Sequence, residues 1–389
     1  MTFVYIRMAC LLLALIAAPL SLLLLMVGQS FESTVFGMAG VMIGLAPLLV
    51  CLGRENEQPG LEWAGWLGFL VWAGLTIWLV TRAPDGKRPA EARIQHRYAD
   101  GGWRFQRQAL GNLVPELDQF LMGFQVVPLL DSLMTFEQAR ELSGWTEEIY
   151  RELEADEDFH ALGSVMPVAY EDLFFGRANR GHSFIYVPPG LKRDVPAPVL
   201  VFLHGSGGNF KAYPWLLSQV ADALGMVLVC PSYGMGNWTE PASAKVVEKA
   251  LAEAGKVARL DRERMHLMGL SNGGKGVSHV GRDLGTQFRS LTFISPIMEE
   301  DATESLRFMA RWKDKPVFVI TGAEDDRVPL SYVADAAARM KKNGAQVTFK
   351  TVTDADHFLL FSHREEVIAQ LKQWLAAAMK TEEGKTAPR

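Results

Sequence analysis

The first eighty residues of the chain are almost entirely apolar and fall into three runs separated by short polar segments. The runs cover residues 8–28, 35–52 and 61–80, and each has about the length that a helix needs to cross a bilayer. Trp63, Trp66 and Trp78 lie toward the ends of the third run, where indoles favour the membrane interface. A buried hairpin in a water-soluble core is the alternative, but three such runs have few places to hide there. We therefore expect residues 1–81 to form a membrane domain of three transmembrane helices.

The side of the membrane follows from the basic residues around these runs. Arg7 alone precedes the first run, and the others gather after the third, at Arg82, Lys87, Arg88, Arg93 and Arg97. The positive-inside rule then places the remainder of the chain in the cytoplasm. A cleaved signal peptide would reverse this. However, the apolar part of the first run is too long for one, and Met26-Val27-Gly28 is a poor cleavage site, so we expect a retained helix.

Residues 82–182 have the pattern of a helical connecting region. Apolar residues recur at helical spacing and end at Pro128, namely Leu113, Leu117, Phe120, Leu121 and Phe124. We expect this helix to pack on the following domain; the alternatives are an amphipathic helix on the membrane or a lid over a site. Residues 145–159 are acidic and predict a solvated helix.

From residue 183 short apolar strands alternate with helices. The expected strands are 184–187, 199–203, 226–230, 265–268, 291–294, 317–320 and 347–352. The expected helices lie near 211–224, 242–256, 272–284, 302–312, 331–343 and 360–379. This alternation predicts an α/β domain over 183–379 with a mostly parallel, doubly wound sheet, followed by a flexible tail at 380–389. Ligands of such sheets bind at the carboxyl ends of the strands.

Net charge and cysteine spacing exclude some classes of function. The formal net charge of −5 indicates no nucleic-acid partner. Cys10, Cys51 and Cys230 are far apart in the sequence and form neither a disulfide framework nor a metal-binding spacing.

A serine lies between an expected strand and an expected helix in the segment Gly269-Leu-Ser271-Asn272-Gly273. This is the G-x-S-x-G pattern of a nucleophile elbow, in which flanking side chains would collide with the neighbouring strand or helix. The turn exposes the Ser271 hydroxyl and leaves the Asn272 amide facing a developing oxyanion. The pattern alone is also that of an ordinary glycine-rich turn.

Three further segments follow expected strands and contain residues that could take part in catalysis, and the first of them is a glycine-rich loop. The loop His204-Gly205-Ser206-Gly207-Gly208 has small residues whose amides can approach a substrate oxygen. We expect the Ser206 amide to pair with that of Asn272 in an oxyanion hole, with Gly207 as the alternative donor and His204 supporting the loop.

An acid and a base follow later strands in the order that a catalytic triad requires. Asp325 and Asp326 both follow the strand at 317–320, and His357 follows the last strand. A carboxylate there can orient the imidazole and stabilise its cation. The remaining seven histidines have no comparable context, and we interpret them as structural or surface residues.

Four motifs in this order resemble those of the α/β-hydrolase superfamily, in particular its esterase, polyhydroxyalkanoate-depolymerase-like and dienelactone-hydrolase-like branches. They are the His204 loop, the Ser271 elbow, Gly322-x-x-Asp325-x-x-Val328-Pro329, and Asp356-His357-Phe358. The resemblance covers about residues 183–379. It implies a Ser271–His357–Asp325 triad, with the acid on Asp325 rather than Asp326, and no metal or organic cofactor.

The resemblance implies hydrolysis of a carboxylic ester through an acyl-enzyme. The expected partners are a small-molecule or lipid ester as substrate and membrane lipids, and membrane attachment is compatible with a lipid or other amphiphilic ester. A serine peptidase or amidase of the same fold is the enzymatic alternative, because the fold does not fix the chemistry. A non-catalytic membrane-tethered binding protein is the other alternative, although such a protein has no physical need for the complete set of motifs.

Overall fold

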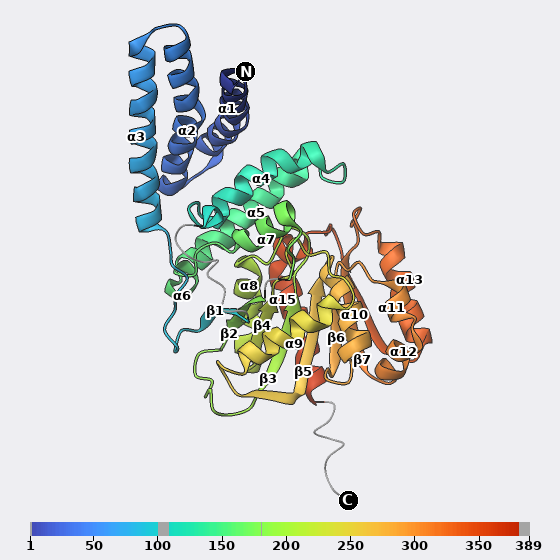
Figure 1. Cartoon of the computed structure of the whole chain (residues 1–389). Helices are drawn as coiled ribbons and strands as arrows, with labels where there is room; N and C mark the ends of the chain where they lie inside the picture. Colours follow the sequence, from blue (N-terminus) through green and yellow to red (C-terminus); the bar gives the residue numbers. More distant parts are fainter. Residues whose placement is uncertain (1, 100–108, 180, 381–389) are drawn as a thin grey trace, which may run out of the picture. The chain divides into compact units, whose positions relative to one another are not determined.

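The computed structural model describes residues 2–99, 109–179 and 181–380 and divides into two compact units (Figure 1). Of the described residues, one unit holds 2–85 and 109–143, and the other holds 86–99, 144–179 and 181–380. The tail predicted at 380–389 lies outside the described residues, apart from Lys380.

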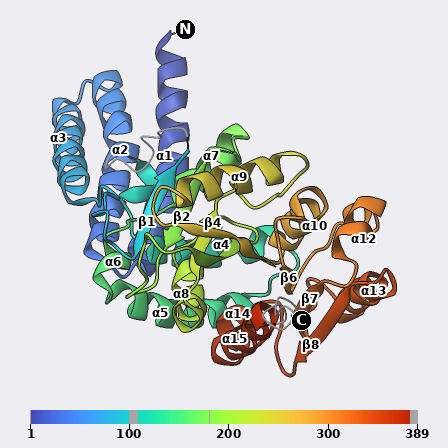
Figure 2. The same ribbon diagram turned by 90° about the horizontal axis from the view of Figure 1, so that it is seen from below.

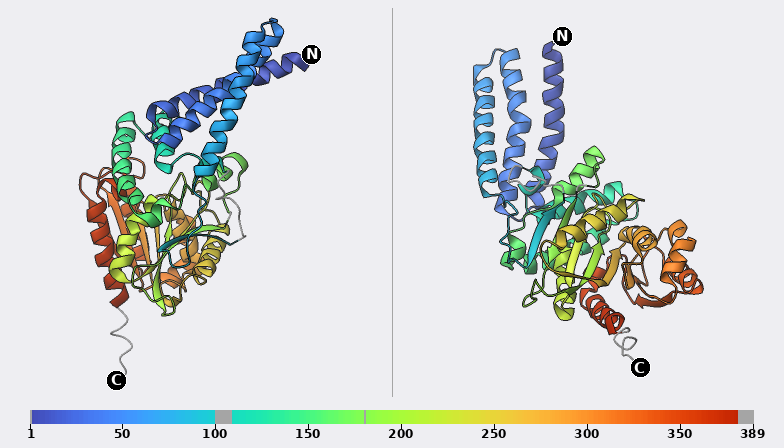
Figure 3. Two further views of the ribbon diagram at one scale, coloured as in Figure 1. Left: turned by 90° about the vertical axis from the view of Figure 1, so that its left-hand side faces the viewer. Right: turned by 60° about the horizontal axis from the view of Figure 1, so that its bottom comes forward.

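Three long helices, α1 (Thr2–Val27), α2 (Phe31–Glu55) and α3 (Pro59–Arg82), make up most of the first unit. All three are long and apolar enough to cross a membrane, as the sequence predicts, and they lie side by side in Figure 3. Small residues allow this close packing: a Cβ added at Gly37 would lie 2.6 Å from Leu25 Cγ, and one at Gly65 would lie 2.6 Å from Val50 Cγ2.

The first unit also contains the 3₁₀ turn η1 (Leu110–Asn112) and helix α4 (Glu116–Leu130). One expectation for this segment is wrong. The helix continues through Pro128 to Leu130, because a proline this near the carboxyl end disturbs only the last turn. The helix clusters with the apolar helices, and its expected packing on the following domain stays a prediction.

An eight-stranded sheet forms the second unit, in the order β1-β2-β4-β3-β5-β6-β7-β8. The strands are β1 (Ile94–Tyr98), β2 (His182–Tyr186), β3 (Ala197–Leu203), β4 (Val227–Pro231), β5 (Leu260–Leu270), β6 (Ser290–Ile294), β7 (Pro316–Gly322) and β8 (Gln346–Val352). Strand β2 pairs antiparallel with β1 and β4, and all other pairs are parallel. This strand order is that of the α/β-hydrolase fold, so the predicted fold class is confirmed.

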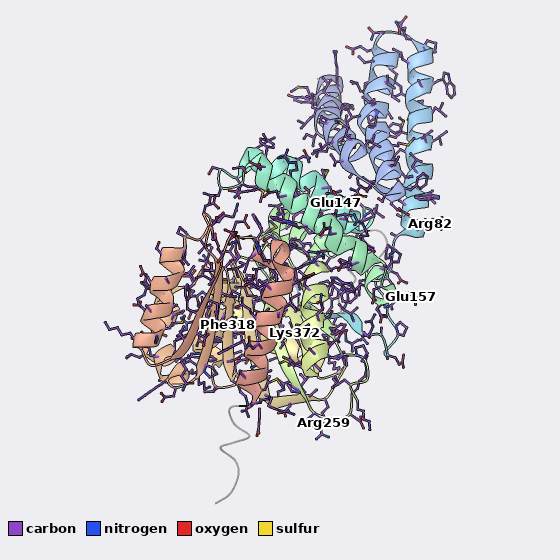
Figure 4. The ribbon with its side chains drawn as sticks, turned by 180° about the vertical axis from the view of Figure 1, so that it is seen from behind. Arg82, Glu147, Glu157, Arg259, Phe318 and Lys372 are labelled. Carbon is purple, nitrogen blue, oxygen red and sulfur yellow. The ribbon has the colours of Figure 1, made fainter. Side chains whose placement is uncertain are left out.

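Helices cover both faces of the sheet (Figure 2). One face packs against α9 (Ala242–Ala254), α10 (Gly273–Leu284), α12 (Leu306–Trp312) and α13 (Leu330–Lys342) in one large apolar core. The other face carries α8 (Ala212–Leu224) and α15 (Arg364–Lys380). Figure 4 shows α15, which carries Lys372, beside the strand that carries Phe318; Trp374 of α15 stacks on the Phe318 ring at 5.2 Å. Short helices α11 (Glu300–Thr303) and α14 (Leu359–Ser362) complete this region.

The region predicted as a helical connection, 82–182, contributes more than helices. It supplies β1 and the first residue of β2, so the sheet begins before residue 183. Its helices are α4, α5 (Phe136–Glu154), α6 (Glu157–His160) and α7 (Met166–Phe175). Helix α5 is not simply solvated, because Ile149, Tyr150 and Leu153 on one face are fully buried.

Candidate active site

Ser271 lies in a sharp turn between β5 and α10 at the carboxyl edge of the sheet. Its φ of 51° is in the left-handed region, where an L-residue is strained. The Ser271 amide donates to Ile294 O at 2.9 Å, which fixes the turn against β6. A Cβ at Gly269 would lie 2.5 Å from Gly273 O, and one at Gly273 would lie 2.1 Å from Leu203 O. Only glycine fits at both positions, for the steric reason that the sequence motif suggests.

His357 bridges the serine and an aspartate. Its Nε2 lies 2.9 Å from Ser271 Oγ, and its Nδ1 lies 2.9 Å from Asp325 Oδ2. The structure therefore brings together the three residues that the sequence proposes for nucleophile, base and acid. Asp326, the alternative acid, is exposed, whereas Asp325 is buried.

The Asp325 carboxylate is held from its far side as well. Its Oδ1 accepts the amide N–H groups of Val328 at 2.8 Å and Arg327 at 3.1 Å. A close backbone approach brings the two loops together, since a Cβ at Gly322 would lie 2.2 Å from Ala355 O. One carboxylate oxygen is thus committed to the backbone, and the other is left for the His357 ring.

The loop His204–Gly208 lies beside the serine turn. The Asn272 side-chain amide donates to Ser206 Oγ at 2.7 Å, which joins this loop to the turn. The Gly207 amide donates to Met235 O at 3.0 Å and is therefore occupied, so the alternative oxyanion donor is not free. Within the described part of the chain, the amides of Ser206 and Asn272 donate no hydrogen bond.

His204 supports the loop, as expected from its position. Its Nε2 accepts the Tyr233 amide at 2.9 Å and its Nδ1 lies 2.8 Å from Gly205 O, so the neutral ring with the proton on Nδ1 satisfies both contacts. Burial lowers the pKa of His204 to about 4, which keeps this tautomer uncharged. A Cβ at Gly205 would lie 3.2 Å from Leu270 O and from Ser271 Cβ, so the loop approaches the serine turn closely there.

A buried polar network beneath this loop is absent from the sequence predictions. Asn209 donates through Nδ2 to Cys230 O at 2.8 Å and to Ser232 Oγ at 3.1 Å. Ser232 Oγ also lies 2.6 Å from His182 Nδ1, and His182 Nε2 lies 2.9 Å from His96 Nδ1. Burial lowers the pKa of both histidines, that of His96 to about 3. Only the position of Asn209, directly after the glycine loop, could have drawn attention to this network.

Helix α7 supports the loop from another side, and the sequence does not reveal this either. Asp172 Oδ2 accepts the Met235 amide at 2.8 Å, and Met235 in turn accepts from Gly207. A Cβ at Gly208 would lie 3.1 Å from Ala169 Cβ. The described residues contain no cluster of three or more His, Cys, Asp or Glu side chains that could hold a metal ion.

Comparison with known sequences gives one partial family match. A model of the prolyl oligopeptidase family matches residues 299–382, a range that includes Asp325 and His357 but not Ser271. Comparison with curated protein sequences finds no match.

Several solved esterases resemble the chain weakly. A thermostable esterase is 18% identical with a TM-score of 0.40, and the match covers 50% of this chain and 58% of that one. A hyperthermophilic esterase from the archaeon Pyrobaculum calidifontis is 18% identical with a TM-score of 0.40, covering 51% and 80%. The esterase Est2 from Thermogutta terrifontis is 20% identical with a TM-score of 0.39, covering 54% and 89%. The fold assignment depends on the strand order of the sheet itself.

Proposed function

We propose that this chain, which has the α/β-hydrolase fold, is a membrane-anchored serine hydrolase that cleaves carboxylic esters with Ser271 as nucleophile. The observation that carries the proposal is the hydrogen-bonded series Ser271 Oγ, His357 and Asp325, with both contacts at 2.9 Å. A strained serine at a strand-to-helix turn, within reach of an imidazole held by a buried carboxylate, meets the geometric requirements of an activated nucleophile.

The mechanism follows from these contacts. His357 Nε2 takes the proton from Ser271 Oγ as the oxygen attacks the ester carbonyl carbon. Asp325 keeps the other ring proton on Nδ1 and stabilises the imidazolium. His357 then gives the proton to the departing alkoxide, leaving an acyl-enzyme that water hydrolyses by the same steps.

The amides of Ser206 and Asn272 are the proposed oxyanion donors. Each is free of other partners within the described residues, and the hydrogen bond from the Asn272 side chain to Ser206 Oγ links their two segments. Each donor aimed at the tetrahedral oxyanion contributes roughly 3 kcal/mol to transition-state stabilisation.

An ester is the proposed substrate class, and a lipid or amphiphilic ester fits an enzyme attached to a membrane. A peptidase or amidase activity is the second candidate, because the prolyl oligopeptidase family model matches residues 299–382. A panel of p-nitrophenyl esters of increasing acyl length and proline-containing peptide p-nitroanilides separates the two. Faster turnover of the peptide substrates would reject the ester assignment.

The anchor in this proposal consists of α1, α2 and α3, each of membrane-spanning length. The basic residues after α3 support a cytoplasmic location for the catalytic unit, through the positive-inside rule. A green fluorescent protein fused after residue 389 should then fluoresce, while an alkaline phosphatase fused there should be inactive. The opposite pair of results would place the unit outside.

Replacing Ser271 with alanine tests the nucleophile. We expect loss of p-nitrophenyl ester turnover and of labelling by a fluorophosphonate probe, because only an activated serine reacts with either. Ser295→Ala is the matched control: Ser295 also has a positive φ, at the end of the neighbouring β6, but its Oγ is buried and has no hydrogen-bond partner in the described residues. Unchanged turnover in Ser271→Ala would reject the proposal.

A further inference from the structure

Helix α4 has an unusual composition for a helix outside the three apolar spans. Its only charged residues, Glu116 and Asp118, are buried near its amino end, and the twelve residues from Gln119 to Leu130 carry no charge. Fifteen residues of helix extend roughly 22 Å, too short to cross a hydrocarbon core of about 30 Å. An apolar helix of this length belongs either in a protein core or at a membrane interface.

The amino end of α4 is fixed at one end of the three-helix bundle. Asp118 Oδ1 accepts the Gln29 amide at 2.8 Å, and Asp118 Oδ2 accepts the Ser30 amide at 3.1 Å and the hydroxyls of Ser30 and Ser33. Gln29 and Ser30 belong to the link between α1 and α2, and Ser33 lies in the first turn of α2. A buried carboxylate thus completes the cap of α2 and joins α4 to it.

Two further contacts place the start of α4 at the same end of the three-helix bundle. Leu113, just before α4, packs in a buried cluster with Val35 near the start of α2 and with Leu79 and Ala83 at the end of α3. Asn112 Nδ2 also donates to Pro84 O at 2.6 Å. The segment leading into α4 therefore lies where α1 ends, α2 begins and α3 ends, which is the headgroup level if the three helices span a bilayer.

The carboxyl end of α4 is apolar and exposed. Leu129 is 69% exposed and Leu130 is 81% exposed, and Leu133 and Phe136 just beyond them are also exposed. We propose that α4 lies in the headgroup region of the bilayer and inserts the side chains of Leu129 and Leu130 into the boundary between the headgroups and the acyl chains. This inference rests on the proposed membrane anchor. An uncharged helix tethered at the end of a membrane bundle can bury its apolar side chains in lipid without moving away from that bundle.

The test uses the full chain in phosphatidylcholine–phosphatidylglycerol vesicles, with an environment-sensitive fluorophore on single cysteines. The native cysteines are replaced by alanine, and Leu129→Cys and Leu130→Cys carry the label. Leu306→Cys is the matched control, because Leu306 is an exposed leucine (83%) on α12 of the sheet-containing unit. Leu45→Cys, on the exposed side of α2, reports the anchor itself.

We expect lipids spin-labelled near the headgroup to quench positions 129 and 130 at least about twofold more strongly than lipids labelled deep in the chain. Position 45 should show the reverse order, and position 306 should be quenched by aqueous iodide only. If 129 and 130 respond like 306, or if neither lipid nor iodide reaches them because protein covers them as a lid, the inference is wrong. If position 45 also fails to respond to lipid, the anchor fails, and fluorophosphonate labelling shows separately whether the hydrolase proposal stands.

A measurement without substitutions guards against a poorly folded cysteine-free chain. A photoactivatable apolar diazirine dissolved in the vesicles labels side chains exposed to lipid. In the unaltered protein, peptides from 119–136 should be labelled together with those of α1, α2 and α3, and the peptide that contains Leu306 should not. Absence of label from 119–136, with label on α1 to α3, would overturn the proposal.

Discussion

Replacing Asp325 with asparagine changes one atom of the candidate site and should change the proton position on His357. In the native site, Asp325 Oδ1 accepts the amides of Arg327 and Val328, and Oδ2 lies 2.9 Å from His357 Nδ1. Two backbone N–H groups can bond only to an acceptor, so the asparagine oxygen must remain at the Oδ1 position. The NH₂ group then faces the ring.

A donor facing Nδ1 forces that nitrogen to accept, and the ring proton moves to Nε2. Nε2 lies 2.9 Å from Ser271 Oγ and, once protonated, cannot remove the serine proton. We expect kcat to fall about 10⁴-fold, the cost of this replacement in a Ser–His–Asp protease, which corresponds to about 5.5 kcal/mol in the barrier.

The assay is kcat for a short-chain p-nitrophenyl ester in detergent micelles, with thermal unfolding measured on the same samples. Asp326→Asn is the matched control, because Asp326 is exposed and neighbours Asp325 in the chain. We expect this control to retain kcat within about threefold, as exposed substitutions change little. A loss of less than tenfold in Asp325→Asn, or an equal loss in Asp326→Asn, would refute the tautomer argument.

Two further predictions concern the loop beside Ser271. Asn209→Ala removes the donor to Cys230 O and Ser232 Oγ, so we expect the free energy of unfolding to fall by about 1–3 kcal/mol. We also expect kcat to fall with little change in KM. An unaltered kcat would show that Asn209 does not position the loop. Burial lowers the pKa of His204 to about 4, so between pH 6.5 and 4 the folded state binds fewer protons than the unfolded chain. The contribution of the neutral His204 ring to the free energy of unfolding is therefore fully present above pH 6.5 and is lost as the pH falls toward 4. The unfolding temperature should fall across that window, less steeply in His204→Gln, and an equal slope in that variant would contradict the assignment.

Seven of the eight described strands were predictable. Most of them are buried on both faces and therefore form continuous apolar runs, whereas β8 is mostly exposed and keeps apolar residues only at alternate positions such as Val347 and Phe349. Every residue of β3, for example, is buried. Strand β1 escaped prediction because Gln95, His96 and Arg97 interrupt its apolar pattern. It lies at the edge of the sheet and, among the described strands, pairs only with β2, so much of its stabilisation comes from a partner distant in sequence.

The positions of the candidate catalytic side chains were predictable because the strands that precede them were predictable. Ser271, Asp325 and His357 each follow a strand, and parallel strands bring their carboxyl ends to one edge. The support beneath the loop was not predictable. The network from Asn209 to His96 joins side chains more than a hundred residues apart, and neither a motif nor a period in the sequence marks such pairs.

The geometry of the site requires two close backbone contacts, at Gly273 and Gly322, that bring the loops of the candidate catalytic residues together. Gly273 allows the turn to touch Leu203 O at the end of β3, and Gly322 allows the Asp325 loop to touch Ala355 O, two residues before His357. Each contact is too close for a Cβ, so an alanine at either position would separate two strand ends. Because the two 2.9 Å contacts of His357 leave little room for such separation, these glycines determine whether the serine and the aspartate can share one imidazole.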